Sequence, residues 1–404
     1  MANHDMMRNS NLLSVFEAIS KHGPVAKKEI QALTGLSWGS ISGICADLLN
    51  SGIIRHGREI TVHSGRAPKN FEINPDKNLI IGVDINLKGI TGVVIDLRGR
   101  TKSIIEEPLQ DTSRSVLMSQ AKNLIHKLLM KEGSKNEVKG IGISFPGHVN
   151  LAAGLSVRIP HLNGFDGYPI CDDIKKEFGI DTLLDNDTNC IAVAEHIFGI
   201  ANETDNFLLL RLSSGIGMAT VVDGEVFRGK NGATGEIGHM TMHPDGPKCQ
   251  CGNNGCLETY ASLLSIIGQC SEGASLGLSQ ILADSRQEPL TIHEIMNAGT
   301  AGDPYCRSVL GKAAAYTGIA LANAINLLDP DRVVLCGELA AYDYYSNLII
   351  HFTQEKIWRN EPVDFCISYD HGISAAIGAA TLFIKQIFLK TLNRPEYTGH
   401  PYLI

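Results

Sequence analysis

The sequence predicts a mixed α/β chain with a small helical head and a larger body in which strands and helices alternate. Apolar residues recur at helical spacing over roughly the first fifty positions and stop at breakers such as Gly23-Pro24. From Asn78 onward, β-branched runs alternate with amphipathic segments. The 404 residues, of which 44% are hydrophobic and 19% charged, suffice for two or three domains with a sizeable core.

Composition narrows the class of protein further. No run approaches the roughly 18 to 20 apolar residues of a membrane-spanning helix, and the start lacks the layout of a signal peptide, so we expect a cytoplasmic protein without membrane insertion. Residues 1–75 carry eight Lys/Arg against six Asp/Glu, whereas the rest carries 27 against 37. A mildly basic head on an acidic body is compatible with one nucleic-acid surface. Seven cysteines stand singly among apolar residues and are expected as buried thiols: Cys45, Cys171, Cys190, Cys270, Cys306, Cys336 and Cys366.

The head is predicted to contain three helices. The first ends at His22, and the second covers residues 27–34 and ends at Gly35, whose missing side chain suits a tight turn between crossing helices. Ser37 is placed to cap the third helix, residues 37–50, which turns Ile41, Ile44 and Leu48 to one apolar face. This order predicts a helix-turn-helix.

A wing and a basic linker are predicted to follow. Residues 53–55 and 59–62 are β-prone runs around a turn, which predicts a winged helix-turn-helix as residues 1–63 and an extended linker as residues 64–77. The helix start and the basic residues after it are candidate DNA contacts: Ser37, Trp38, Ser40, Ser42, Arg55, Arg58 and Arg66. A three-helix module that binds protein is the alternative.

The body, residues 78–404, is predicted to have two lobes. Residues 79–85 and 92–96 are expected as paired strands, residues 115–131 as a helix and residues 140–145 as a buried strand. Similar alternations begin near Phe207 and Arg332.

Three clustered cysteines and one histidine predict a metal site. His239, Cys249, Cys251 and Cys256 supply one imidazole and three thiols within 18 residues. Four protein ligands form a closed tetrahedral set for Zn²⁺, so the expected ion is structural, and a reducing compartment disfavours disulfides. Gly252 and Gly255 let the chain fold tightly around the ion.

The same region resembles a known family. Glu236, the histidine three residues later and the CxCGxxGCxE pattern at residues 249–258 look like the signature of the ROK family of repressors, open-reading-frame proteins and sugar kinases. The resemblance covers nearly the whole chain, because the regulators of that family carry a winged helix-turn-helix head. It implies a two-lobed actin/hexokinase-like (ribonuclease H-like) ATPase-type fold for residues 78–404, with a zinc-binding segment at residues 236–258.

Asn186 and Asp187 stand where a predicted strand gives way to a helix. Carboxylate and amide groups in such a place suit the binding of hydroxyls, and a helix-capping turn is the alternative. The resemblance implies that Asn186 binds a sugar hydroxyl and that Asp187 occupies the position of the kinases' general base. It also places Gly147, Glu236, His239 and Glu258 at the sugar. His239 would then direct one ring nitrogen to zinc and the other to a sugar hydroxyl.

The nucleotide-binding turns depart from the kinase pattern. ROK kinases carry an Asp-x-Gly-Gly-Thr-Lys-like turn whose backbone approaches phosphate, whereas residues 84–89 replace both glycines, by Asn86 and Leu87. The second turn, residues 213–217, and the adenosine-side turn, residues 333–338, are only partly kept. We therefore expect no catalytic residue, with Asp187 as a vestigial base.

These observations predict a sugar-responsive DNA-binding transcriptional regulator, a repressor of carbohydrate uptake or catabolism genes. Its partners would be a double-stranded DNA operator, a sugar or sugar phosphate, and further copies of the chain in a homodimer or a dimer of dimers. One alternative is a ROK-family sugar kinase that phosphorylates hexoses with ATP and carries a DNA-binding head. Another is a body that serves as a docking platform for a second protein.

Overall fold

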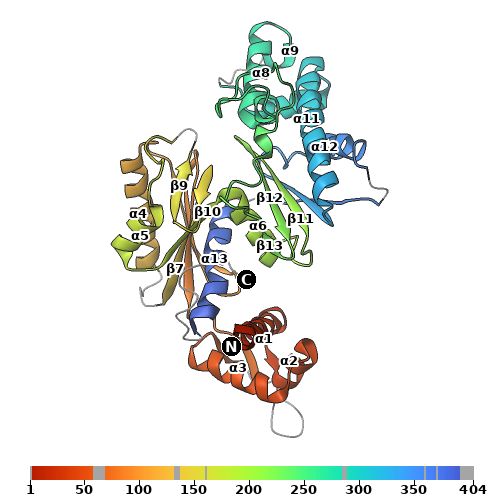
Figure 1. Ribbon diagram of the computed structural model, residues 1–404. Helices are drawn as coiled ribbons and strands as arrows, with labels where there is room; N and C mark the ends of the chain where they lie inside the picture. The colour runs from red at the N-terminus through yellow and green to blue at the C-terminus, as the bar shows by residue number, and fades with distance from the viewer. Residues whose placement is uncertain are drawn as a thin grey trace. The chain divides into compact units, whose positions relative to one another are not determined.

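The computed structural model describes residues 2–57, 69–131, 137–159, 162–283, 289–358, 361–369 and 372–391. The chain divides into two compact units, Met1–Asp187 with Ala375–Ile404, and Thr188–Ser374. Each unit contains one five-stranded sheet with helices packed on it (Figure 1). The predicted mixed α/β class is confirmed.

The head, at the start of the first unit, consists of three helices and a small sheet. Its helices are α1 (Ala2–His22), α2 (Lys27–Thr34) and α3 (Trp38–Asn50). Gly35, in the left-handed region at φ 68°, ends α2, and Ser37 caps α3 by accepting the backbone N–H of Ser40. The helices share a core of buried apolar side chains: Leu12, Val15, Ile19, Ile30, Ile41, Ile44 and Leu48. The predicted helix-turn-helix and its capping residues are confirmed.

The wing strand lies further along the chain than predicted. Strand β2 (Ile54–His56) pairs antiparallel with β3 (Asn70–Ile73), which also pairs with β1 (Val25–Ala26) and is the central strand of that sheet. The prediction of an extended linker is therefore wrong for residues 70–73. The reason is that Phe71 and Ile73, two residues apart and both buried, turn to the core of the head. Residues 59–62, predicted as the second wing strand, lie outside the described residues.

The large sheet of the first unit has the order β10-β7-β4-β5-β6. An antiparallel meander of β4, β5 and β6 continues into the parallel strands β7 and β10. The elements of this unit are β4 (Leu79–Ile85), β5 (Gly89–Ile95), β6 (Thr101–Pro108), α4 (Arg114–Lys131), β7 (Val138–Phe145), β8 (His148–Asn150), β9 (Leu155–Arg158), α5 (Ile170–Phe178), β10 (Thr182–Asn186) and α13 (Ser374–Thr391). The strands and the helix predicted between residues 79 and 145 are confirmed.

Glycines allow helices to approach both faces of this sheet. A Cβ at Gly82 or Gly142 would lie 1.9 Å from a backbone carbonyl oxygen of α13. A Cβ at Gly92, which points to the opposite face, would lie 2.1 Å from Leu124 of α4. Helices α13 and α4 therefore cover opposite faces.

The second unit repeats this topology. Its sheet has the order β13-β12-β11-β14-β15, again a meander followed by two parallel strands. Its elements are α6 (Asp187–Phe198), β11 (Phe207–Leu212), β12 (Ile216–Val222), β13 (Glu225–Val226), η1 (Ile237–His239), α7 (Glu258–Ala261), α8 (Leu263–Ser275), α9 (Gln280–Ala283), α10 (Ile292–Ala301), α11 (Pro304–Leu328), β14 (Arg332–Cys336), α12 (Asp343–Gln354) and β15 (Asp364–Ile367). Two such units agree with the two-lobed, ribonuclease H-like fold that the family resemblance implied.

Within the described ranges, no single helix is long and apolar enough to cross a membrane. Helices α2 and α3 reach the required length and hydropathy only when taken together across their 117° bend.

Candidate metal centre and ligand-binding residues

Four side chains of types that can ligate a metal ion lie together in the second unit. The donor atoms of this cluster all lie within 4.8 Å of one another: His239, Cys249, Cys251 and Cys256. The sulfurs of Cys251 and Cys256 are 3.6 Å apart, and His239 Nδ1 is 3.6 Å from Cys249 Sγ. Thiolates that share a tetrahedral zinc are separated by roughly 3.8 Å, whereas disulfide sulfurs are about 2 Å apart. The cluster therefore has the spacing of a shared metal ion, and the structure brings together all four residues that the sequence singled out.

Tight turns fold the chain around this cluster. Gly255 is in the left-handed region at φ 64°, and a Cβ there would lie 1.7 Å from the carbonyl oxygen of His243. Single β-bridges join Thr241 to Cys256 and Lys248 to Asn254. Apart from the short η1 and α7 at its ends, this segment has little regular structure, so a bound ion would supply much of its order.

Two glutamates flank His239. Oε1 of Glu258 lies 3.0 Å from Cys249 Sγ and 3.4 Å from His239 Nδ1. Oε2 of Glu236 lies 3.8 Å from Nε2, the other ring nitrogen, and the Glu236 side chain is 46% exposed. The imidazole thus turns Nδ1 to the cluster and Nε2 to a solvent-accessible carboxylate, which is compatible with the two roles predicted for it.

The thiols differ in how readily they ionise. Burial raises the pKa of Cys249, and its hydrogen bond to Glu258 adds to the rise. Burial also opposes ionisation of Cys251, but a hydrogen bond from the Asn253 backbone, together with the neighbouring thiols, lowers its pKa below the usual value. A divalent cation would favour the thiolate at every position, because a coordinating thiol is deprotonated.

The candidate sugar-binding residues of the first unit lie at the junction of β10 and α6. Asn186 is the last residue of β10, and its Nδ2 donates to the carbonyl oxygen of Gly147 at 2.9 Å. Gly147 adopts φ 76°, and Asp187 begins α6 with 8% of its surface exposed. The structure therefore brings these three residues to one edge of the sheet.

A polar side chain fills the turn that would hold phosphate in a kinase. Oδ1 of Asn86 accepts the backbone N–H groups of Lys88 and Gly89, at 2.8 and 3.2 Å. Its Nδ2 donates to Asp84, which also accepts the hydroxyl of Ser144. Phosphate binding at such a turn depends on backbone N–H groups that point at the ligand. Two of those N–H groups already donate to Asn86 within the turn. The sequence showed the replacement of glycine by Asn86 but did not predict these hydrogen bonds.

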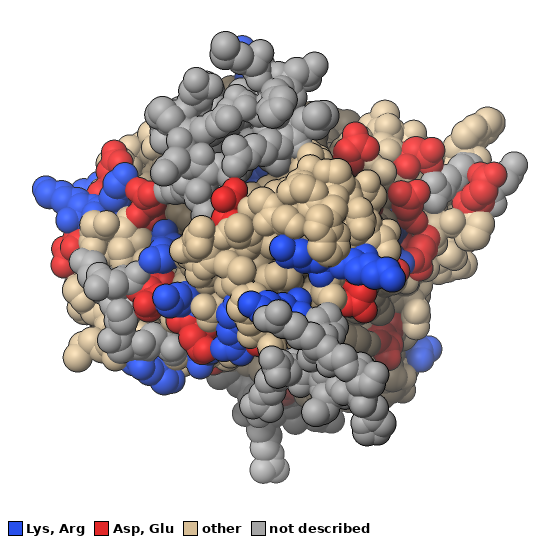
Figure 2. Space-filling view, turned by 90° about the horizontal axis from the view of Figure 1, so that it is seen from below, with Lys and Arg blue, Asp and Glu red and all other residues tan. Residues whose placement is uncertain are grey.

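The predicted DNA contacts on α3 lie at its exposed start. Trp38 is 53% exposed. The hydroxyls of Ser37 and Ser40 are 2.9 Å apart, and the hydroxyl of Ser42 accepts from Lys27 Nζ at 3.3 Å. Figure 2, which views the molecule from below, shows central residues that are neither Lys, Arg, Asp nor Glu, with side chains of both charges around them.

The predicted basic contacts have a different placement. Arg55 pairs with Glu72 at 2.7 Å and with Asp76 at 3.1 Å, so two carboxylates already neutralise its guanidinium. Arg58 and Arg66 lie outside the described residues.

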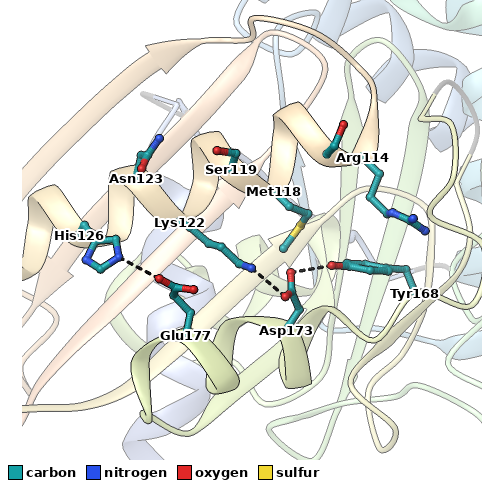
Figure 3. Close-up of a pocket in the computed structure, with 10 residues that line it drawn as sticks. Arg114, Met118, Ser119, Lys122, Asn123, His126, Tyr168, Asp173 and Glu177 are labelled. Atoms are coloured by element: carbon teal, nitrogen blue, oxygen red, sulfur yellow. Dashed lines mark hydrogen bonds and ion pairs between the residues drawn. The ribbon is translucent and has the colours of Figure 1, made fainter.

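A polar groove of about 420 Å³ between α4 and α5 was not anticipated from the sequence (Figure 3). Lys122 Nζ lies 2.7 Å from Asp173 Oδ1, and Tyr168 donates its hydroxyl to Asp173 Oδ2 at 2.6 Å. Burial and the Asp173 carboxylate raise the pKa of Tyr168 to about 12. His126 Nε2 lies 3.4 Å from Glu177 Oε1, which makes a second contact between the two helices. Because these groups pair with one another across the groove, they hold α5 against α4.

The family model described as "ROK family" matches residues 80–386. The chain belongs to the ROK family. Among similar proteins is the DNA-binding transcriptional dual regulator NagC of Escherichia coli K12, 27% identical over 346 residues, with 85% of this chain and 84% of that protein covered. The xylose repressor of Bacillus subtilis is 27% identical, and the match covers 83% of this chain and 84% of that protein. The xylose repressor of Caldicellulosiruptor bescii is 26% identical, and the match covers 98% of this chain and 100% of that protein.

Solved structures from the ROK family also resemble this chain. A ROK family transcriptional regulator, described as a homologue of the E. coli MLC protein, matches with a TM-score of 0.80 and 26% identity over 96% of this chain and 98% of that chain. The ROK hexokinase of Thermus thermophilus matches with a TM-score of 0.65 and 27% identity over 77% and 99%. The named sequence relatives are regulators, whereas the structural relatives include kinases.

Proposed function

We propose that this ROK protein is a sugar-responsive DNA-binding transcriptional regulator and represses genes of carbohydrate uptake or catabolism. The head, extended to β3 at Ile73, would bind an operator in double-stranded DNA, and the remainder would bind a sugar or sugar phosphate. Two chains would read a two-fold operator as a homodimer, or as a dimer of dimers. Relatives that bear the names N-acetylglucosamine repressor and xylose repressor support this proposal.

The turn at residues 84–89, which corresponds to a phosphate-binding turn of the kinases, favours a regulator over a kinase, because a side chain of this chain already binds its backbone N–H groups. Phosphoryl transfer relies on positioning and charge stabilisation of the phosphates by backbone N–H groups, cations and metal ions. In this chain Asn86 binds two N–H groups of the turn, and Leu87 adds a side chain where the family pattern has glycine. We therefore propose that the protein keeps sugar-binding residues without transferring phosphate.

Zinc is the proposed occupant of the Cys/His cluster. Three thiols and one imidazole are the donor set that zinc takes in structural sites, and the 3.6 Å spacings suit its tetrahedral geometry. His239, Cys249, Cys251 and Cys256 would hold the ion. Zinc on Nδ1 would fix the orientation of the His239 ring and leave Nε2, beside Glu236, for a sugar hydroxyl.

Operator binding with and without sugar tests the proposal. An operator would be selected from random duplex DNA and its affinity measured by fluorescence anisotropy, with xylose, N-acetylglucosamine and their phosphates as probes. We expect one probe to change operator affinity at least tenfold. Glu236→Gln should weaken this response and leave affinity in the absence of sugar unchanged, whereas Glu225→Gln, on β13, serves as the matched control. Operator affinity that no sugar or sugar phosphate alters would contradict the sensor role.

A sugar kinase with a DNA-binding head is the second candidate. It is favoured by the placement of Asn186 and Asp187 at the β10–α6 junction. Sugar-dependent hydrolysis of ATP that Asp187→Asn abolishes would support it.

A further inference from the structure

The exposed start of α3 lacks the side chains that usually read bases by paired hydrogen bonds. Arg, Lys, Asn and Gln make such bidentate contacts with guanine or adenine in the major groove. None of these residue types occurs from Trp38 to Leu49, and Asn50 is the last residue of the helix. The face away from the core consists instead of Trp38, Gly39, Ser40, Gly43 and Ala46. Hydrogen-bonded readout by long polar side chains is therefore ruled out for most of α3.

The serines at this end already form hydrogen bonds within the head. Ser37 accepts the backbone N–H of Ser40 at 3.2 Å, and the two hydroxyls are 2.9 Å apart. Ser42 accepts from Lys27 Nζ, which joins α3 to α2. These contacts fix the start of the helix and the connection between α2 and α3.

Trp38 is the one large side chain on the exposed start of α3, in the part of the chain that the structure describes. It is 53% exposed in the first turn, where a helix in the major groove contacts base edges. A Cβ on the adjacent Gly39 would have its nearest neighbour at 4.0 Å, and one on Gly43 would have none within 4 Å. The indole therefore lies beside two glycines whose missing side chains leave room for a DNA duplex to approach the helix backbone.

We infer that Trp38 is the specificity-determining residue of α3 and that it recognises thymine by contact with its C5-methyl group in the major groove. Thymine is the base whose major-groove edge carries a methyl group, and apolar contact with it is an established mode of readout. Duplex DNA is the partner, because the helix-turn-helix presents this residue and the head is the basic part of the chain. Lys28 is exposed on α2, and lysine is a residue type that contacts phosphate. This inference rests on the proposed function.

Uracil substitution tests the inference on the unaltered protein. Each thymine of the selected operator is replaced in turn by uracil, which removes the methyl group alone. Burial of one methylene is worth about 0.8 kcal/mol, so we expect a loss of about fourfold in wild-type affinity at one or more positions of each half-site. Because this arm needs no variant, it does not depend on whether a variant folds.

Trp38→Ala should weaken operator binding by about tenfold or more, and it should abolish the difference between thymine and uracil at those positions. Trp358→Ala is the matched control, since Trp358 is the other tryptophan of the chain, is 90% exposed and lies outside the head. Equal wild-type affinity for the thymine and uracil operators at every position would overturn the inference, as would full discrimination by Trp38→Ala. Failure to select any sequence over random DNA would instead overturn the proposed function.

Discussion

Loss of the proposed zinc ion is expected to destabilise the second unit measurably. The ion would crosslink His239 to Cys256, a span of 18 residues with little regular structure. In the loop-entropy model, a crosslink that closes a loop of this length stabilises the fold by about 3 kcal/mol. For a domain of 150 to 250 residues, each kcal/mol corresponds to roughly 2–4 °C in Tm. Chelation, or Cys251→Ser, should therefore lower the Tm of this unit by about 6–12 °C.

Metal content and calorimetry together check this prediction. Atomic emission should find one zinc per chain, and calorimetry should show the loss of Tm in the chelated protein and in Cys251→Ser. Cys366→Ser is the control, because Cys366 is a partly exposed thiol on β15 outside the cluster. A purified chain without bound metal would refute the reasoning, and so would an unchanged Tm after the metal is removed.

Two further predictions concern packing and charge in the first unit and in α11. Gly142→Ala should lower stability by roughly 1–3 kcal/mol, because its Cβ would meet the backbone of α13 at 1.9 Å, whereas Gly311→Ala, inside α11 with open space around it, should raise stability by roughly 0.5–1 kcal/mol. Equal Tm shifts in these two variants would contradict the glycine argument. Burial opposes the Asp173 carboxylate, but hydrogen bonds from Lys122 and Tyr168 hold its pKa below the usual value. A carboxyl whose pKa is lower in the folded than in the unfolded state stabilises the fold at pH values above its unfolded pKa of about 3.9. This stabilisation is lost as the pH falls through the pKa of the folded state. The Tm of Asp173→Asn should thus lie below wild type at pH 7 and converge with it below about pH 4; a gap that persists unchanged in acid would exclude this origin.

The sequence by itself determined the features that depend on neighbouring residues. Gly35 and Ser37 mark the turn and the cap of the helix-turn-helix, because helix ends are satisfied by groups within a few residues. The Cys/His cluster was readable for the same reason, since its donors fall within 18 residues and its glycines allow the chain to turn back. The loss of glycine at Asn86 was visible as a departure from the family pattern.

Only the tertiary structure decided the contacts between distant segments. Strand β3 is the central strand of the head sheet because it pairs with β1 and β2, which lie some 15 to 45 residues earlier in the chain. Arg55 forms ion pairs with Glu72 and Asp76 for the same reason, whereas the sequence predicted it as a DNA contact. Lys122 and Asp173 are brought together across 51 residues by the packing of α4 and α5. Such pairings follow from the way whole elements bury their apolar faces, and no short window of sequence contains that information.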